Sequence, residues 1–202
     1  APIDAARSLQ ALLFALLLCT LGYLSGSILF APLVCQLLNA PPPHLYGSRN
    51  PGATNVYRIA GPGPAMLTLL GDALKGWAPV TLAQHLEATP ATQAAVALAA
   101  IAGHMLPAFS RFRGGKGVAT TLGTGLALAG GTIMAMALIW LLIFRRWQIA
   151  SLASITAAGI GPLLALWLNP AHAGLFLIIA LVLLVRHRDN LVRLAQGSEN
   201  HF

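Results

Sequence analysis

Long apolar stretches alternate with short polar segments along the whole chain. The apolar stretches cover residues 9–31, 64–84, 91–109, 118–129, 132–144, 149–168 and 172–186. None of them shows the two-residue alternation of a β-barrel strand, and a helix satisfies its own backbone hydrogen bonds in lipid. The pattern therefore predicts an all-α, polytopic integral membrane protein in which these stretches are transmembrane helices.

The number of crossings depends on two short neighbouring stretches, 118–129 and 132–144. They could form one long helix, or two helices joined by a tight turn at Gly130 and Gly131. Cytoplasmic loops carry an excess of Lys and Arg, and seven crossings with the N-terminus outside leave only Arg7 on the outer side. The cations placed inside are then Arg49, Arg58, Arg111, Arg113, Lys116, Arg145, Arg146, Arg186, Arg188 and Arg193. We therefore expect one membrane domain, residues 1–202, with seven transmembrane helices, the N-terminus outside and the C-terminus in the cytoplasm.

The composition supports a membrane protein. Hydrophobic residues make up 57% of the chain and charged residues 8%, whereas ordinary soluble domains have about 25% charged residues. The net charge of +7 does not indicate nucleic-acid binding, because no basic run is interleaved with aromatic residues. Cys19 and Cys35 would lie about 24 Å apart on one helix, which is too far for a disulfide, so we expect packing or lipid-facing roles for them.

Most of the polarity is concentrated in three clusters, the first of which covers residues 47–58. It follows Pro41–Pro43 and has the composition of a loop. Its short polar side chains and its glycine are Ser48, Asn50, Gly52, Thr54 and Asn55. Loops of this kind can direct backbone N–H groups at an anion, and Arg58 can bind a phosphate with two hydrogen bonds. The alternative is an ordinary capped turn before the next helix.

The second cluster covers residues 113–120. Gly114, Gly115 and Gly117 surround Lys116 just before the helix that we expect to begin near residue 118. Glycines allow close backbone approach, and a helix N-terminus favours anions. The segment is not a nucleotide-binding P-loop, because Gly117 follows the lysine where Ser or Thr is required. A basic anchor at the membrane interface is the alternative.

The third cluster covers residues 186–193. His187 and Asn190 are three residues apart and therefore share one helix face, whereas Asp189 points elsewhere. A histidine near the membrane surface can act as a general acid or base, or it can be an ordinary interfacial polar residue. Glu199, in the following tail, could cap a helix, pair with an arginine or orient His187.

A few polar residues fall within the expected spans. Asp72 and Lys75 are three residues apart, and each charge in a bilayer costs roughly 2.5–3.5 kcal/mol, so we expect a structural pair. A wall of the site is the alternative. His104 is expected to be a packed polar residue. Ser151 and Ser154 lie near the cytoplasmic end of the stretch 149–168; hydrogen bonding back to the helix is their default, although either could face a site.

Several kinds of catalytic site are not indicated by the sequence. It has no His-x4-Asp pair, too few acids for a two-metal phosphotransferase site, no Cys/His cluster typical of zinc and no Gly-x-Ser-x-Gly elbow. We therefore expect a cationic site for phosphate-bearing ligands, without a metal, a cofactor or a protein nucleophile.

Five motifs in order along the chain are similar to those of one family. They are Gly-Ser-x-Asn-Pro-Gly-Ala-Thr-Asn-Val-x-Arg at 47–58, Asp-x-x-Lys-Gly at 72–76, Gly-His-x-x-Pro-x-Phe at 103–109, Gly-Gly-Lys-Gly-Val-Ala-Thr at 114–120 and His-Arg-x-Asn-x-x-Arg-Leu-x-x-Gly-x-Glu at 187–199. Over residues 22–199 the chain resembles the bacterial acyl-phosphate:glycerol-3-phosphate acyltransferases of the PlsY type. Arg49, where glycine is common, and Ser198, where threonine is frequent, are mild departures.

The resemblance implies a seven-helix enzyme of the bacterial inner membrane with its site on the cytoplasmic side. Such an enzyme transfers a fatty acyl group from acyl phosphate to the 1-hydroxyl of glycerol 3-phosphate, giving lysophosphatidic acid and phosphate in phospholipid biosynthesis. Its partners are the two substrates, membrane lipid and, functionally, the enzyme that makes acyl phosphate. Nucleic acid is not expected.

The resemblance also implies roles for residues of the motifs. Ser48 and Arg58 would bind substrate phosphate and be essential, Lys116 with Gly114, Gly115 and Gly117 would form the glycerol 3-phosphate site, and His187, Asn190 and Glu199 would serve activity or the integrity of the site. Asn50, Gly52, Thr54, Asn55 and Ser154 are expected to contribute to substrate binding.

Two mechanisms and one alternative function remain open. The proton of the attacking hydroxyl could pass to His187 or to the phosphate of the donor; the substrate-assisted chemistry that the resemblance implies, together with the lack of a His–carboxylate dyad at an obvious spacing, favours the donor phosphate. A transporter or channel for phosphorylated metabolites would also need a cationic site. The nearly wholly apolar stretches 91–109, 132–144 and 172–186 argue against a conduction path.

Overall fold

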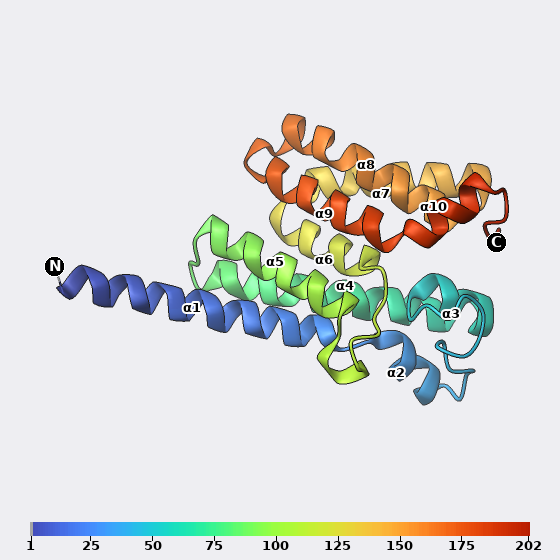
Figure 1. Cartoon of the computed structure of the whole chain (residues 1–202), viewed down its shortest axis with the longest axis horizontal. Coiled ribbons are helices and arrows are strands. Elements are labelled where there is room, and N and C mark those ends of the chain that lie inside the picture. The colour runs from blue at the N-terminus through green and yellow to red at the C-terminus, as the bar shows by residue number, and fades with distance from the viewer. Residues whose placement is uncertain (1) are drawn as a thin grey trace.

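The computed structural model describes residues 2–202, with side chains from residue 5 onward, and every regular element in this part of the chain is helical (Figure 1). The longer helices are α1 (Pro2–Ser27), α4 (Pro62–His85), α5 (Pro90–Met105), α6 (Val118–Leu128), α7 (Gly130–Trp147), α8 (Ala150–Leu168) and α9 (Ala173–Arg186). The shorter elements are α2 (Phe30–Leu37), α3 (Ala53–Ala60), α10 (Arg188–Ala195) and the 3-10 turns η1 (Ala108–Ser110) and η2 (Pro170–His172). The predicted all-α class is confirmed.

Six of the seven apolar stretches correspond to one longer helix each, α4 to α9, and the first covers most of α1 and the start of α2. The stretches 118–129 and 132–144 are two separate helices, because the chain breaks at Ala129, whose φ and ψ are −150° and 60°. Gly117 at the start of α6 and Gln148 at the end of α7 line the same cavity. The two helices therefore run in opposite directions as a hairpin (Figure 1).

The first apolar stretch is not one continuous helix. α1 ends at Ser27, residues 28 and 29 are not helical, and α2 begins at Phe30. Pro32 lies in the first turn of α2, where a proline is tolerated, but it would break the interior of a longer helix. The expectation that one helix separates Cys19 from Cys35 is therefore wrong, although both cysteines are free and Cys35 is buried in the packing of α2.

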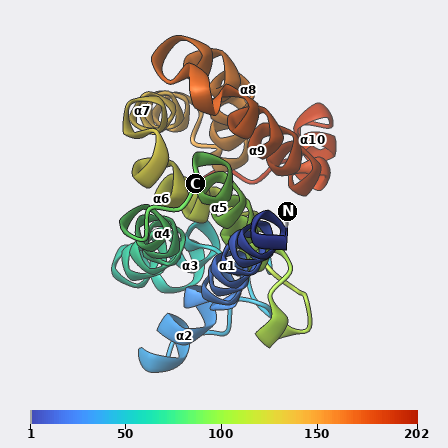
Figure 2. The ribbon, with the colours of Figure 1, turned by 90° about the vertical axis from the view of Figure 1, so that its left-hand side faces the viewer.

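The helices form two groups. α1, α4 and α5 pack together, α7, α8 and α9 form the other group, and α6 lies between them (Figure 2). Gly26 of α1 packs so closely on α5 that a Cβ would overlap the carbonyl of Ala100, and Gly123 of α6 packs in the same way on Ala73 of α4. Such contacts through small residues are typical of membrane helices, where lipid provides no hydrophobic drive for association.

Among the residues that the structure describes, four helical segments are long and apolar enough to cross a membrane. They are Ala5–Ser27, Pro90–Ser110, Gly130–Trp147 and Ala150–Leu168, and α9 with α10 would make a fifth although the pair is bent by 63°. α6 is apolar but has only 11 residues, or roughly 16 Å of helix, against a hydrocarbon thickness of about 30 Å. The protein is therefore an integral membrane protein whose helices differ in reach.

Candidate active site

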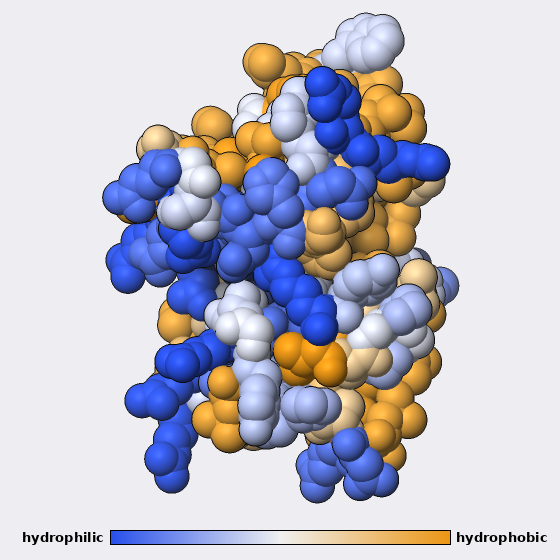
Figure 3. All heavy atoms as spheres, turned by 90° about the vertical axis from the view of Figure 1, so that its right-hand side faces the viewer, coloured by the Kyte–Doolittle hydropathy of each residue, from blue (hydrophilic) through white to orange (hydrophobic). Residues whose placement is uncertain are grey.

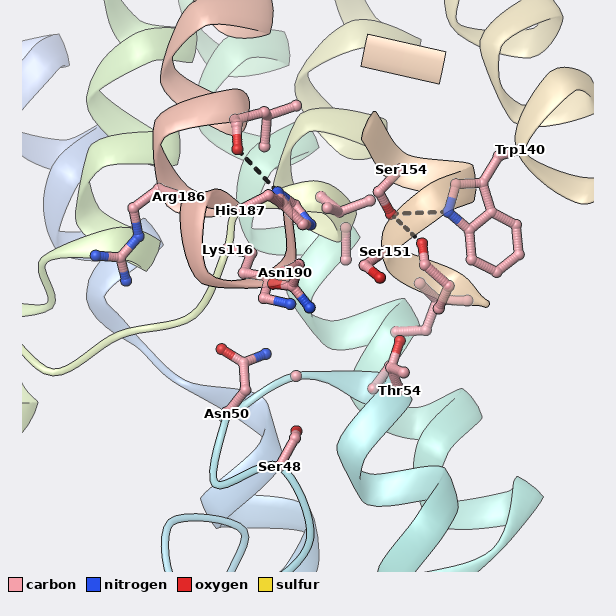
Figure 4. Close-up of a pocket in the computed structure, with 18 of the residues that line it drawn as sticks. Ser48, Asn50, Thr54, Lys116, Trp140, Ser151, Ser154, Arg186, His187 and Asn190 are labelled. Carbon is pink, nitrogen blue, oxygen red and sulfur yellow. Dashed lines mark hydrogen bonds between the residues drawn. The ribbon is translucent and has the colours of Figure 1, made fainter. Parts of the chain in front are cut away.

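One cavity of about 990 Å³ lies at the end of the bundle where α3, α10 and the start of α6 meet. Residues of all three polar clusters line it. Figure 3 shows hydrophilic side chains gathered on this end of the molecule, and Figure 4 shows the pocket at closer range. Segments far apart in the sequence, 47–58, 113–120 and 186–193, thus come together in space.

The loop before α3 is folded by its own asparagine. The side-chain amide of Asn55 donates hydrogen bonds to the carbonyls of Pro43 (2.9 Å) and Tyr46 (3.1 Å), and its Oδ1 accepts one from the N–H of Ser48 (2.8 Å). Gly47 has a φ of 61° and no room for a Cβ beside Asn55, a conformation that suits glycine. Asn55, which the sequence analysis expects to contribute to substrate binding, is buried, is not part of the cavity lining, and shapes the loop that presents Ser48.

Arg58 brings a cation to the cavity from α3. Its Nη2 is 3.5 Å from the carbonyl of Asn200, and its guanidinium carbon lies 4.6 Å from the ring centroid of Phe202. The Nε of Arg58 is buried without a hydrogen-bond partner. Burial lowers the pKa of Arg58, and the negative charge of Glu199 partly offsets this effect. A phosphate in the cavity would supply the missing partner.

The glycine loop, residues 113–117, is held by two residues outside it. The N–H of Gly115 donates to the carbonyl of His104 (3.1 Å), and Nη2 of Arg186 donates to the carbonyls of Gly114 (3.2 Å) and Gly115 (2.8 Å). Gly115 therefore pairs its backbone N–H and carbonyl within the protein. It lies outside the cavity lining, although the resemblance implies that it belongs to the glycerol 3-phosphate site. Gly117, with a φ of 85°, precedes α6, whose first N–H groups lack helical partners and can bind an anion.

Lys116 is the side chain that this loop directs into the cavity (Figure 4). Burial lowers its pKa to about 8. The positive charges of Arg193 and Arg58 act in the same direction, whereas Glu199 raises the pKa. Lys116 is thus a cation near neutral pH whose charge depends on its surroundings.

His187 lies at the junction of α9 and α10, where the chain bends. Its Nδ1 is 2.8 Å from the carbonyl of Leu183; because a carbonyl can only accept, Nδ1 carries the proton and Nε2 has the free lone pair. Burial and the positive charge of Lys116 lower the pKa of His187 to about 4. The imidazole is therefore neutral and weakly basic, with its ring directed into the pocket (Figure 4).

Glu199 organises the third cluster. One carboxylate oxygen accepts from Nδ2 of Asn190 (2.9 Å), and the other accepts from Nε of Arg193 (2.8 Å). Of the roles left open by the sequence, Glu199 pairs with an arginine and orients Asn190, whereas Leu183 orients His187. Asp189 also lines the cavity, but its side chain is exposed and pairs with Arg188.

The two serines at the start of α8 differ in what their hydroxyls can do. Ser154 Oγ accepts from Nε1 of Trp140 (2.9 Å) and donates to the carbonyl of Ala150 (2.9 Å), so its hydroxyl is engaged within the protein. Ser151 Oγ is buried at the cavity without a partner. Ser151 is therefore the better candidate for a hydrogen bond to a substrate. The only feature of the sequence that pointed to it was its position near the first turn of the stretch 149–168.

The cavity also has an apolar side. Between α6, α7 and α8 it is lined by Leu122, Ile133, Met136, Ala137 and Ala157. The phosphate-binding groups are therefore continuous with a surface suited to hydrocarbon.

Comparison with known families identifies the family of the chain. The sequence profile described as glycerol-3-phosphate acyltransferase matches residues 16–197, nearly the whole chain. The chain belongs to the glycerol-3-phosphate acyltransferase family. A glycerol-3-phosphate acyltransferase of Hahella chejuensis is 53% identical over 187 residues, covering 92% of this chain and 96% of the relative. One of Halorhodospira halophila is 44% identical over 186 residues, covering 91% and 94%.

Two solved structures have the same fold as this family member. They are crystal structures of PlsY, an integral membrane glycerol 3-phosphate acyltransferase, in a glycerol 3-phosphate form and a lysophosphatidic acid form. Their TM-scores are 0.87 and 0.86, each at 36% identity, covering 93% of this chain and 95% of PlsY. The predicted membership of the PlsY family is confirmed.

Most of the site residues expected from the sequence meet at the cavity of this family member. Those that line it are Ser48, Asn50, Gly52, Thr54, Arg58, Gly114, Lys116, Gly117, Ser154, His187, Asn190 and Glu199. Asn55 and Gly115 lie behind the wall and hold the loops. Arg186, the first residue of the third polar cluster, and Ser151, which the sequence left open, also line the cavity. Trp140 lines it too, although it lies in an apolar stretch with no motif to single it out.

Proposed function

We propose that the protein transfers a fatty acyl group from acyl phosphate to the 1-hydroxyl of glycerol 3-phosphate. The products are lysophosphatidic acid, for phospholipid biosynthesis, and inorganic phosphate. One observation carries the proposal: a single cavity joins the cations Arg58, Lys116 and Arg193 to the apolar wall between α6, α7 and α8. Two phosphate-bearing substrates suit the cations, and the alkyl chain of the donor suits the wall.

We place the cavity on the cytoplasmic side of a bacterial inner membrane, with seven crossings and the N-terminus outside. The hairpin of α6 and α7 supports this topology, because it brings Arg145 and Arg146 to the end of the bundle where the other cations lie. Cations in connecting segments favour the cytoplasm. Since α6 is too short to cross alone, the glycine loop reaches below the membrane surface, where an acyl chain can enter from the lipid.

In the proposed reaction the 1-hydroxyl oxygen of glycerol 3-phosphate attacks the acyl carbonyl carbon. The bond between that carbon and the phosphate oxygen breaks, and the hydroxyl proton passes to the departing phosphate. A base with a pKa of about 4, such as His187, is poorly matched to this task at neutral pH. The mixed anhydride is already activated, so neither ATP nor a covalent acyl-enzyme is required.

The side chains of the site then act by orientation and charge. Lys116 and the glycine loop hold glycerol 3-phosphate, Ser48 and Arg58 hold the donor phosphate, and Asn190 completes the wall between them. Preorganised cations stabilise the charge that develops on the carbonyl oxygen and the departing phosphate. We propose that this chemistry proceeds without a metal ion, because the carboxylates that line the cavity already have partners: Glu199 is engaged by Asn190 and Arg193, Asp72 by Lys75, and Asp189 by Arg188.

The test uses purified protein with palmitoyl phosphate and glycerol 3-phosphate, and follows phosphate release and lysophosphatidic acid together. Acyl-CoA and an acyl carrier protein thioester serve as parallel donors, and a separate enzyme that makes acyl phosphate can be coupled to the assay. We expect equal amounts of both products from acyl phosphate and none from the thioesters. Turnover only with a thioester would contradict acyl phosphate as the acyl donor. Uptake of glycerol 3-phosphate into proteoliposomes without an acyl donor would favour a transport function.

A further inference from the structure

A separate group of buried polar side chains lies inside the bundle, next to the cavity. It consists of Asp72 and Lys75 on α4 and His104 on α5, which are 1%, 5% and 3% exposed. Lys75 Nζ lies 2.7 Å from Asp72 Oδ1, as the sequence predicted for this pair, and His104 Nδ1 lies 3.7 Å from the same oxygen. The three side chains form a buried network that the proposed reaction does not use.

The Asp72–Lys75 pair binds the backbone where α1 gives way to α2. Lys75 Nζ donates to the carbonyl of Ile28 (2.5 Å), and the N–H of Phe30 donates to Asp72 Oδ1 (3.4 Å). These backbone groups lose helical partners at the break, and an unpaired backbone group in a membrane costs several kcal/mol. The pair therefore determines where α2 begins.

α2 in turn supports the first polar cluster. Ala31 and Cys35 of α2 pack against Val56 of α3 in one buried group. α3 carries Arg58, and the loop between the two helices carries Ser48. The position of the α1–α2 break is thus transmitted to the groups that face the cavity.

His104 supports the second polar cluster. Its carbonyl accepts the N–H of Gly115, and its ring touches Gly115 so closely that an added Cβ would overlap Nε2. Arg186 holds the carbonyls of Gly114 and Gly115. The ring of His104 is therefore the support for the loop that directs Lys116 into the cavity.

We propose that Asp72, Lys75 and His104 are positioning residues that hold the two substrate-binding loops in a fixed relation and so set the affinity for glycerol 3-phosphate. Asp72 and His104 border the cavity, but the ring nitrogens of His104 face Asp72 and Gly115, so the network acts through the loops. This inference rests on the proposed function for its choice of ligand.

The test is a double-mutant cycle at the contact between His104 and Gly115. Gly115→Ala places a Cβ against the ring and should raise the KM for glycerol 3-phosphate about tenfold, with a smaller effect on kcat. His104→Ala removes the support and should raise this KM about fivefold. In the double variant the Cβ occupies the vacated space, so we expect a KM no higher than that of Gly115→Ala alone. Effects on KM that multiply would overturn the proposal.

The control is Gly63→Ala in α4, where an added Cβ has no neighbour within 4 Å; its KM should equal that of the wild type. His104→Gln, which keeps most of the side-chain volume, replaces His104→Ala if the latter does not fold, and should show the same coupling in weaker form. Thermal unfolding and the yield of monodisperse protein report on folding. A lower yield with an unchanged KM in the folded fraction would mean a purely structural role and overturn the proposal.

Lys75→Met tests the contribution of the Asp72–Lys75 pair, because it removes both the hydrogen bond to Ile28 and the ion pair with Asp72 while filling similar space. We expect a raised KM for glycerol 3-phosphate although Lys75 lies outside the cavity lining; an unchanged KM contradicts this contribution. Direct binding of radiolabelled glycerol 3-phosphate to each variant separates the two proposals. If binding shows the coupling but the wild type does not turn over acyl phosphate, the proposed reaction fails and the network stands. If the wild type turns over and all variants bind alike, the network alone fails.

Discussion

At the scale of single residues, burial changes the acid–base properties of the groups that meet the phosphates. The same cavity lowers the pKa of Lys116 to about 8 and that of His187 to about 4. Desolvation is the largest cause in both cases, and it disfavours the charged form of a base. An anionic ligand therefore stabilises the charged form of Lys116, whereas His187 stays neutral and serves as a hydrogen-bonding group.

The first prediction concerns the pH dependence of binding. The pKa of free Lys116 is lowered, so the residue is charged below about pH 8 and becomes neutral as the pH rises through this value. We expect kcat/KM for glycerol 3-phosphate to fall between pH 8 and 9.5, since this ratio reports on the free enzyme. In Lys116→Arg, the side chain stays charged over this range, so the alkaline decrease in kcat/KM should move above pH 9.5. If kcat/KM decreased over the same pH range in the wild type and in Lys116→Arg, the decrease would belong to another titrating group.

The second prediction concerns His187. Because its pKa in the free protein is about 4, its titration should not contribute to the pH dependence of kcat/KM for glycerol 3-phosphate between pH 5.5 and 7. His187→Ala should retain measurable turnover, with kcat reduced about tenfold, which is below the 10²–10⁴-fold typical of a lost general base. Single-turnover rates with acyl phosphate, beside direct binding of glycerol 3-phosphate, provide the measurement. A rate near the uncatalysed one with binding intact would make His187 the base.

At the scale of elements, close packing and interruptions of helices position the site. α6 packs on α4 through Gly123, and α6 begins directly after the glycine loop. The contact between the two helices therefore also sets the position of Lys116 along the bundle. The turn at Ala129 then reverses the chain and brings the end of α7 back to the cavity. A single uninterrupted helix over 118–144 would have carried Arg145 and Arg146 to the opposite end.

The third prediction tests this packing. Gly123→Ala places a Cβ on the backbone of Ala73 and should destabilise the protein by about 1–3 kcal/mol through overpacking. Gly159→Ala, in α8, is the matched control, because nothing lies within 4 Å of its added Cβ. Thermal unfolding in detergent should show a lower midpoint for the first variant only. Equal midpoints for the two would mean that α4 and α6 can separate without cost.

At the scale of the whole molecule, the tail joins the two helix groups at the cavity. The N–H of Phe202 donates to the carbonyl of Gln148 after α7 (2.9 Å). Its ring lies against Arg58 and 5.3 Å from the ring of Tyr57 on α3, and 5.1 Å from that of Phe144 on α7. Residues 198–202 thus connect α3 with α7 and hold the guanidinium of Arg58 in place.

The fourth prediction tests this connection. Phe202→Ala removes the cation–π contact with Arg58, worth about 0.5–1 kcal/mol at an exposed site, and should raise the KM for acyl phosphate about two- to fivefold. Phe202→Tyr keeps the ring and should behave as the wild type. Steady-state kinetics for each substrate give the comparison. Equal KM values for the alanine and tyrosine variants would show that the tail does not position Arg58.

The sequence by itself determined the helices and the chemical character of the site. Apolar stretches in lipid must be helical, and a chain with only 8% charged residues concentrates cations and glycines where it binds anions. The family followed from the same segments, because motifs are local in sequence. Lys116 and Arg58 could be named for this reason without any structure.

Only the tertiary structure decided which partners these residues have. Asn55 and Gly115 belong to motifs, yet they hold loops from behind; Ser151 belongs to none, yet its hydroxyl faces the cavity. The link from Asp72 to His104 joins helices α4 and α5, and no sequence spacing encodes it. Hydrogen bonds and burial between distant segments depend on how helices approach one another, and that approach is set by packing over the whole bundle.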